Sequence, residues 1–244
     1  MRHKGSISEN NELCASSLFD SSRKRGTLYF ERNLARAGYR CVAGLDEAGR
    51  GPLAGPVVAG CVVLPRKCEY KLFKDSKLLT AGQRENLFQL LHTCGAKVGY
   101  GIITPEEIDR INILQASLRA MALAVDNLAR QCRINPDFLL VDGTFTAPVN
   151  LPQRALIKGE SKSASIGAAS IIAKVMRDRL MEDFHSRYPL YNFSQNKGYA
   201  TLEHRRAIRK HGPCVIHRRT FSGVKEYLER MNEGEPSGSQ QSLF

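Results

Sequence analysis

Residues 44–52 read Gly-Leu-Asp-Glu-Ala-Gly-Arg-Gly-Pro, and they follow a compact apolar run that begins at Cys41. A second apolar run, Val-Val-Ala-Gly-Cys-Val-Val-Leu, occupies residues 57–64. We expect two neighbouring buried strands joined by a glycine-rich turn, with the first strand stopping at Asp46 and Glu47. An ionised carboxylate beside a hydrophobic core needs a partner, so this acidic pair requires an explanation.

Asp142 ends another apolar run in the same manner, in the sequence Leu-Leu-Val-Asp-Gly. Functional groups of α/β proteins gather beyond the carboxyl ends of strands, so acid-tipped strands lying together would form a cation site. Carboxylates are the oxygen ligands that Mg²⁺ and Mn²⁺ prefer. A turn-capping role explains either aspartate taken alone. Both together, in a basic protein, favour metal binding.

Apolar periodicity indicates that strands and helices alternate along the rest of the chain. Further strands are expected at 97–103, 138–141 and 154–157. Helices are expected at 27–37, 80–93, 111–130, 164–187, 202–210 and 223–230, with a helical turn opened by Pro105. The 164–187 helix is expected to be amphipathic, because its apolar residues recur at spacings of three and four. This order predicts an α/β fold with a mixed central sheet flanked by helices, and a small helical C-terminal region.

Composition divides the chain into four expected parts. Residues 1–26 are polar and serine-rich, which predicts a flexible extension. Residues 27–190 form the α/β domain, and 191–230 form a basic helical region. Residues 231–244 contain glycine, proline, serine and glutamine, which predicts a disordered tail.

The charge of the chain predicts a polyanionic partner. Its formal net charge is +12, from 36 basic and 24 acidic residues. The segment 197–230 has nine basic and three acidic residues, so it carries half of that excess. A basic surface concentrated in one segment is typical of proteins that bind nucleic acid.

Several classes of protein are disfavoured. No apolar run approaches the roughly 18–20 residues of a membrane span, and the first 40 residues lack the apolar core of a secretory signal, so we expect a cytoplasmic protein. Seven cysteines without a Cys-x-x-Cys pair predict neither a disulfide framework nor a thiolate zinc site. A monomer is expected, since no long apolar surface pattern is present.

The glycine-rich turn at 49–55 has a competing interpretation as a dinucleotide-binding loop. The third glycine falls one position away from that fingerprint, and Pro52 stands where a backbone donor would be needed. Glycines here would instead allow the backbone to approach a sugar-phosphate closely.

A Lys-Gly-Tyr segment precedes the basic helix of the C-terminal region. Lys197 can meet a phosphate, and Tyr199 can stack against a sugar or base. Taken alone, such a turn is usually surface structure with a half-packed tyrosine.

Together these motifs resemble the ribonuclease HII family of bacteria. The resemblance runs in order from about residue 27 to 230, and both tails fall outside it. It is carried by residues 39–64, Asp75-Ser76-Lys77, Ile111-Asn112-Ile113-Leu114, Val141-Asp142-Gly143, residues 168–175 with Arg177-Asp178, Lys197-Gly198-Tyr199, and His217-Arg218-Arg219-Thr220-Phe221.

The resemblance implies a ribonuclease H-like fold for 27–190 and a C-terminal region that helps to hold an RNA–DNA hybrid. It implies hydrolysis with two Mg²⁺ or Mn²⁺ ions, leaving a 3′-hydroxyl and a 5′-phosphate. Asp46, Glu47 and Asp142 match three of the family's catalytic, metal-binding acids.

The fourth acid of the family is an aspartate in a Lys-Gly-Asp segment, but this chain has Lys158-Gly159-Glu160. The longer side chain places its oxygens about 1.5 Å further out, against a positioning tolerance near 0.5 Å. We expect Glu160 to remain a ligand and to alter the preference between magnesium and manganese. Asp178 is the rival, although an ion pair with Lys174, four residues earlier on the helix, explains it better.

Recognition of ribose is the remaining expectation from the resemblance. The loop Gly49-Arg50-Gly51 matches the one that touches the 2′-hydroxyl beside the scissile phosphate, and Tyr199 matches a tyrosine that contacts the same nucleotide. The 2′-hydroxyl distinguishes RNA from DNA, so these residues would provide specificity. Two alternatives remain open: a hybrid-binding protein without nuclease activity, and a metal-dependent nuclease of DNA junctions on the same fold.

Overall fold

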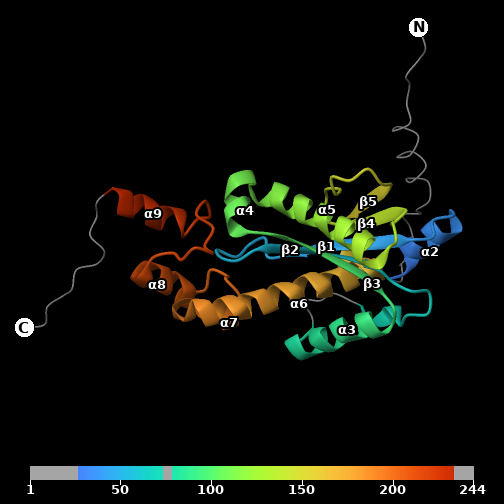
Figure 1. Ribbon diagram of the computed structural model, residues 1–244, viewed down its shortest axis with the longest axis horizontal. Coiled ribbons are helices and arrows are strands. Elements are labelled where there is room, and N and C mark those ends of the chain that lie inside the picture. The colour runs from blue at the N-terminus through green and yellow to red at the C-terminus, as the bar shows by residue number, and fades with distance from the viewer. Residues whose placement is uncertain (1–26, 74–78, 234–244) are drawn as a thin grey trace, which may run out of the picture. The chain divides into compact units, whose positions relative to one another are not determined.

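The computed structural model describes residues 27–73 and 79–233, which divide into two compact units. The first unit consists of 27–48, 58–102 apart from 74–78, and 117–176. The second consists of 49–57, 103–116 and 177–233. Figure 1 shows the elements of both in order along the chain.

A five-stranded sheet forms the centre of the first unit. Its strands are β1 (Val42–Ala48), β2 (Val57–Val63), β3 (Lys97–Ile103), β4 (Phe138–Asp142) and β5 (Gln153–Leu156). They lie in the order β3-β2-β1-β4-β5. β1 pairs with β2 antiparallel and with β4 parallel, and β4 pairs with β5 parallel. The prediction of an α/β fold with a mixed central sheet is confirmed.

The prediction that the first strand stops at the acidic pair was wrong. β1 continues through both acids, because β2 supplies ladder partners as far as the pair Ala48↔Val58. Asp46 lies opposite Gly60, and Glu47 lies opposite Ala59. The backbone of both acids is therefore held within the sheet, and only Asp46 is buried.

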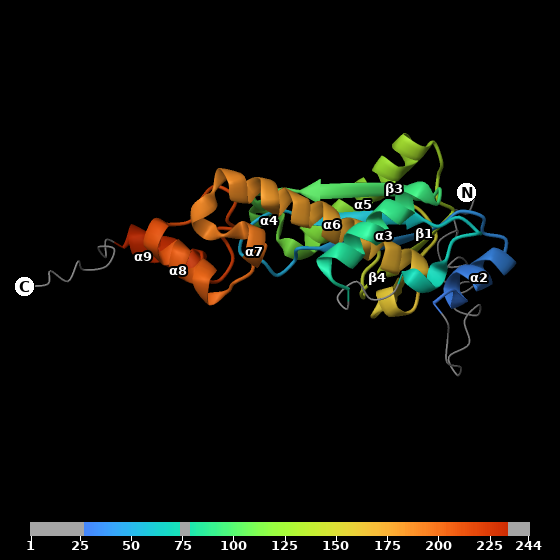
Figure 2. The same cartoon turned by 90° about the horizontal axis from the view of Figure 1, so that it is seen from below.

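Helices cover both faces of the sheet in the first unit. α5 (Ile113–Cys132) lies over one face, and α3 (Ala81–Thr93) and α6 (Ala164–Arg187) lie over the other (Figures 1 and 2). Gly44 and Gly60 allow α6 to approach closely. A Cβ on Gly44 would lie 2.1 Å from the Ser165 backbone, and one on Gly60 would lie 2.4 Å from the Ala169 carbonyl oxygen. Helix α2 (Tyr29–Arg36) packs Phe30 and Leu34 against the sheet residues Phe138 and Leu140.

The prediction that the 164–187 helix is amphipathic was wrong for its first ten residues. Residues 164–173 are buried on every side, because the helix passes between the sheet and α3. Only the later turns alternate buried and exposed positions, as in Met181 beside Glu182. Small side chains such as Ala168 and Ala169 make this buried passage possible.

The regular structure of the second unit is mainly helical, with loops at 49–56, 197–201 and 212–224. It contains α4 (Pro105–Ile111), a 3₁₀ turn η4 (Pro189–Tyr191), α7 (Phe193–Asn196), α8 (Leu202–His211) and α9 (Lys225–Asn232), with the end of α6. Its core comprises Leu53, Ala54, Met181, Tyr191, Phe193, Ile208, Ile216 and Val224. The last two helices were predicted within two residues, whereas η4 and α7 were not predicted.

The loop 49–57 is attached to the C-terminal part of the second unit by backbone hydrogen bonds. The Leu53 N–H donates to the Gly198 carbonyl (2.8 Å), and the Gly55 N–H donates to the Ile216 carbonyl (2.9 Å). The Arg218 N–H donates to the Leu53 carbonyl (2.8 Å). Residues far apart in sequence thus form one framework around the glycine-rich turn.

The division of the chain near residue 190 stays a prediction. The expected extension at 1–26 lies outside the described residues, as does 234–244 of the expected tail, whereas Met231 and Asn232 belong to α9. The six described cysteines are free thiols. In the described ranges, no helix is long and apolar enough to cross a membrane.

Candidate active site

Asp46 and Asp142 stand at matching positions on two adjacent strands. In the parallel pair of β1 and β4, Leu45 aligns with Val141, and each aspartate is the next residue of its strand. Sequence reasoning placed these two carboxylates side by side. The register of β1 and β4 likewise brings Asp46 and Asp142 to neighbouring positions toward the same ends of the two strands.

Asp46 is a buried acid with three other carboxylates near it. Its side chain is buried, and its Oδ1 accepts a hydrogen bond from the Glu47 N–H at 2.7 Å. Burial raises the pKa of Asp46 well above its ordinary value, and the charges of Glu47, Asp142 and Glu160 raise this pKa further. A hydrogen bond from Ser170 acts in the opposite direction. Four carboxylates therefore lie within electrostatic range of one buried point.

Asp142 and Glu160 are linked through the turn that follows β5. The Gly159 N–H donates to Asp142 Oδ1 at 2.5 Å, at the start of the 3₁₀ turn η3 (Gly159–Ser161). Glu160 is buried, and its Oε2 accepts a hydrogen bond from the Ser170 hydroxyl at 3.3 Å. One oxygen of Asp142 thus has the turn-capping role that we considered for it, and the same turn holds Glu160.

The chemistry of this acidic cluster suits a hard divalent cation. Excess negative charge in a buried place is unfavourable, and a cation with carboxylate oxygens as ligands would offset it. Among the described residues, no three His, Cys, Asp or Glu side chains already lie close enough to hold one ion together. Binding an ion by three of the acids therefore requires some of their side chains to turn.

The predicted substrate-binding residues gather in the second unit. A Cβ added to Gly51 would lie 3.9 Å from Tyr199 Cε1, its nearest neighbour, so the tyrosine ring borders this exposed glycine. Tyr199 is 46% exposed, which leaves ring surface open for a ligand. Lys197 is less open, because its Nζ forms an ion pair with Glu182 at 2.9 Å.

Three residues that sequence reasoning did not assign to a site contact the site residues. Ser170 bonds to Glu160, whereas Arg177 and Arg218 bond to the glycine-rich loop. All three lie in motifs quoted above, but their positions beside the acids and the loop depend on long-range packing. The only sequence signal was their place in a recognisable motif.

Fold and acidic cluster together define an α/β protein of the ribonuclease H-like class. The solved ribonuclease H2 of Pyrococcus horikoshii superposes with a TM-score of 0.66 at 32% identity, covering 80% of this chain and 100% of that one. A structure of Bst-RNase HIII in complex with Mn²⁺ shares the fold, with a TM-score of 0.62 at 19% identity, over 82% of this chain and 72% of that chain.

The family model described as Ribonuclease HII matches residues 43–224. A ribonuclease HII of Desulfotalea psychrophila is 54% identical over 87% of this chain and 94% of its own length. The chain therefore belongs to the ribonuclease HII family and is a ribonuclease of the hydrolase class.

Proposed function

We propose that this chain is an endoribonuclease that hydrolyses the RNA strand of RNA–DNA hybrids and cuts duplex DNA at embedded ribonucleotides. The products are a 3′-hydroxyl and a 5′-phosphate. It acts in the cytoplasm as a monomer and uses Mn²⁺ or Mg²⁺. Family membership supports the activity, and the acidic cluster supports the use of a metal.

The carboxylates of Asp46, Glu47, Asp142 and Glu160 are the proposed metal ligands. When bound, a pair of divalent cations would activate water and offset the charge on the phosphate under attack. Ladder pairs with β2 and β5 hold the backbone of Asp46 and Asp142, so metal binding would require their side chains to turn while the strands stay in place. Ser170 orients Glu160 through its hydroxyl.

The proposed specificity resides in the glycine-rich loop and Tyr199. Gly49-Arg50-Gly51 presents backbone to the ribose, and the tyrosine ring packs against the same nucleotide. Lys197 contributes positive charge toward the phosphates after exchanging its contact with Glu182.

One observation carries the proposal: a buried aspartate lies within electrostatic range of three further acids in a protein of net charge +12. A fold that served binding alone would have no reason to gather these carboxyl groups at a buried point in a protein that binds a polyanion.

Cleavage of a DNA duplex with one ribonucleotide tests the proposal. We expect cutting at the ribonucleotide with Mn²⁺ or Mg²⁺ and no cutting in EDTA. Asp46→Asn keeps the side-chain volume and should lower the rate more than roughly 100-fold. Replacing a residue that only supports a metal ligand already costs about 10–100-fold in metal affinity or activity, and Asp46 is a proposed ligand itself. Asp183→Asn, at an exposed position of α6, is the matched control and should retain the wild-type rate.

Two other results would point to the alternatives. Tight binding of the duplex without cleavage in any metal would favour a hybrid-binding protein. Equal cleavage after replacing the ribose by deoxyribose would favour a nuclease of DNA junctions.

A further inference from the structure

Arg218 donates hydrogen bonds from a buried guanidinium to three carbonyl groups of the glycine-rich loop. Its Nη2 donates to the Gly49 oxygen (2.5 Å), its Nη1 to the Arg50 oxygen (2.9 Å), and its Nε and Nη2 to the Gly55 oxygen (3.0 and 2.9 Å). The side chain is fully buried, and its guanidinium carbon lies 4.9 Å from the Phe221 ring centroid. This side chain therefore holds both ends of the turn.

These bonds fix the direction of two consecutive peptide groups. In a trans peptide the C=O of one residue and the N–H of the next point in opposite directions. Because the Gly49 and Arg50 carbonyls face Arg218, the following N–H groups, of Arg50 and Gly51, point away from it. Within the described residues the Gly51 N–H has no hydrogen-bond partner, and Gly51 is exposed.

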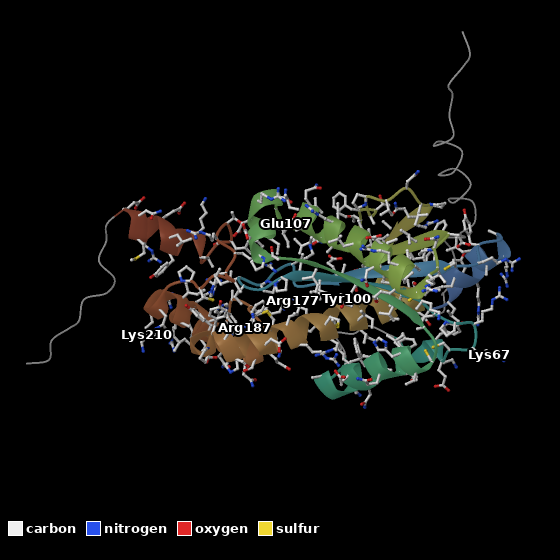
Figure 3. All side chains as sticks on the ribbon, viewed as in Figure 1. Lys67, Tyr100, Glu107, Arg177, Arg187 and Lys210 are labelled. Carbon is white, nitrogen blue, oxygen red and sulfur yellow. The ribbon has the colours of Figure 1, made fainter. Side chains whose placement is uncertain are left out.

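Arg177, labelled in Figure 3, supports the same loop from α6. Its Nε donates to the Pro56 oxygen (3.0 Å) and its Nη2 to the Ala54 oxygen (3.2 Å). Gly49 has a φ of +97°, and a Cβ there would lie 2.1 Å from Arg177 Nε, so only glycine fits against this arginine. The guanidinium carbon of Arg177 lies 5.9 Å from the Tyr199 ring centroid.

The two buried cations differ in what they hold. Arg177 is bonded to carbonyls beyond the turn, whereas Arg218 is bonded to the carbonyls within Gly49-Arg50-Gly51 itself. Loss of Arg218 would free the Arg50–Gly51 peptide to rotate, and its N–H would then lose its fixed direction beside Tyr199.

Building on the proposed function, we propose that Arg218 is a positioning residue for ribose recognition. It turns the Arg50–Gly51 peptide so that the Gly51 N–H faces a ligand oxygen next to Tyr199, and the ligand class is the 2′-hydroxyl of a ribonucleotide within a duplex. Lysine cannot replace it, since an ammonium lacks the planar fork that reaches three carbonyls at once.

Affinity for paired duplexes tests this role. Titrations in EDTA, which prevents cleavage, compare a DNA duplex with one ribonucleotide and the same duplex in all-DNA form. The wild type should prefer the ribonucleotide duplex, and Arg218→Lys should reduce that preference about 5-fold, the effect of one hydrogen bond. Affinity for the all-DNA duplex should change less than about 2-fold, because the charge is kept. Arg219→Lys, the exposed neighbour, is the matched control and should keep the preference.

A second change removes the donor and leaves Arg218 in place. Replacing Gly51 by glycolic acid exchanges its N–H for an ester oxygen and should cause the same loss, so the inference stays testable if Arg218→Lys does not fold. An unchanged preference in the ester variant overturns the inference, as does a folded Arg218→Lys variant that weakens both duplexes equally. A wild type without any preference in EDTA overturns the inference alone, whereas absence of cleavage of the ribonucleotide duplex in Mn²⁺ and Mg²⁺ would contradict the proposed function.

Discussion

At the scale of single residues, Glu160 is the proposed ligand whose side chain is one methylene longer than the aspartate that the sequence resemblance predicts there. Its carboxylate is buried and bonded to Ser170, so the longer side chain is already held in one place. Glu160→Asp withdraws the oxygens by about 1.5 Å, which exceeds a tolerance near 0.5 Å. We expect the ratio of cleavage rates in Mn²⁺ and Mg²⁺ to change several-fold, as measured by steady-state kinetics. An unchanged ratio would count against Glu160 as a ligand, and Glu229→Asp on exposed α9 is the control.

Tyr199 allows a second prediction at this scale. Its half-exposed ring borders Gly51, where a ribose would lie. Tyr199→Ala should lower cleavage at a single ribonucleotide by about 10-fold or more, the effect of one stacked contact, while duplex binding falls less than about 3-fold. Tyr199→Phe keeps the ring and should retain most of the cleavage. Equal losses of cleavage and binding in the alanine variant would refute the assigned role.

Sequence reasoning identified the acids but not the groups that orient them. Asp46 and Asp142 were predictable because an acid after an apolar run has a local signature. Ser170 and Arg218 have none, since each acts on residues distant in the chain: Ser170 on Glu160, and Arg218 on Gly49. Contacts of that kind depend on tertiary packing.

At the scale of elements, a buried histidine pair connects α8 to the turn at 214–217. His204 Nε2 lies 3.0 Å from His217 Nε2, His204 Nδ1 lies 2.8 Å from the Tyr199 carbonyl oxygen, and His217 Nδ1 accepts from the Cys214 N–H at 2.9 Å. All three contacts are satisfied when both rings are neutral, with the His204 proton on Nδ1 and the His217 proton on Nε2. Protonating either ring breaks that pattern.

This pair predicts that stability falls in mild acid. Burial, followed by the charge of His204, lowers the pKa of His217 from 6.5 to about 4, and burial lowers the pKa of His204. The unfolded chain therefore binds more protons, so stability is fully present above pH 6.5 and is lost as pH falls toward 4. Between pH 7.5 and pH 5 we expect a loss of roughly 2 kcal/mol from His217, because pH 5 lies about 1.5 units below its unfolded pKa and each unit contributes 1.36 kcal/mol.

Urea unfolding at pH 7.5 and pH 5 measures this loss. His217→Gln should be less stable at pH 7.5 but should lose less stability between the two values than the wild type does. His211→Gln, at an exposed position of α8, should follow the wild type. An acid dependence that is identical in wild type and His217→Gln would remove the pair from the explanation.

Strand and helix positions were largely predictable because each depends on a local period of apolar residues. β3 matched its predicted bounds, and α3 began one residue after the predicted start, at the Thr80 cap. The continuation of β1 through its acids was not predictable, because it depends on ladder bonds to β2. The buried start of α6 was not predicted for a similar reason. The spacing of its apolar residues does not indicate that α3 packs against the side of α6 that faces away from the sheet.

At the scale of the whole molecule, the net charge of +12 predicts salt-sensitive binding. Each phosphate that the protein neutralises contributes about −0.9 to the slope of log K against log salt concentration. The exposed face of α8, with Arg206 and Lys210, belongs to the basic segment. Arg206→Gln with Lys210→Gln should reduce the slope by about 2 for hybrid and all-DNA duplexes alike. An unchanged slope would exclude this face from phosphate contact.

The composition of the chain could predict a polyanionic partner, but it could not predict which segments form each of the two compact units. The glycine-rich loop belongs to a compact unit with residues more than 100 positions later. That association follows from hydrogen bonds such as Gly55 to Ile216 and has no counterpart in local sequence.

Anomalous diffraction from crystals soaked in Mn²⁺ tests the central claim most directly, because it locates bound metal without relying on activity. We predict a manganese peak with carboxylate oxygens of Asp46 and Asp142 at about 2.1–2.3 Å, within the range for hard cations. The Asp46→Asn protein should show a weaker peak or none. Manganese bound only away from these acids, or no peak near Asp46 at saturating metal, would contradict the account.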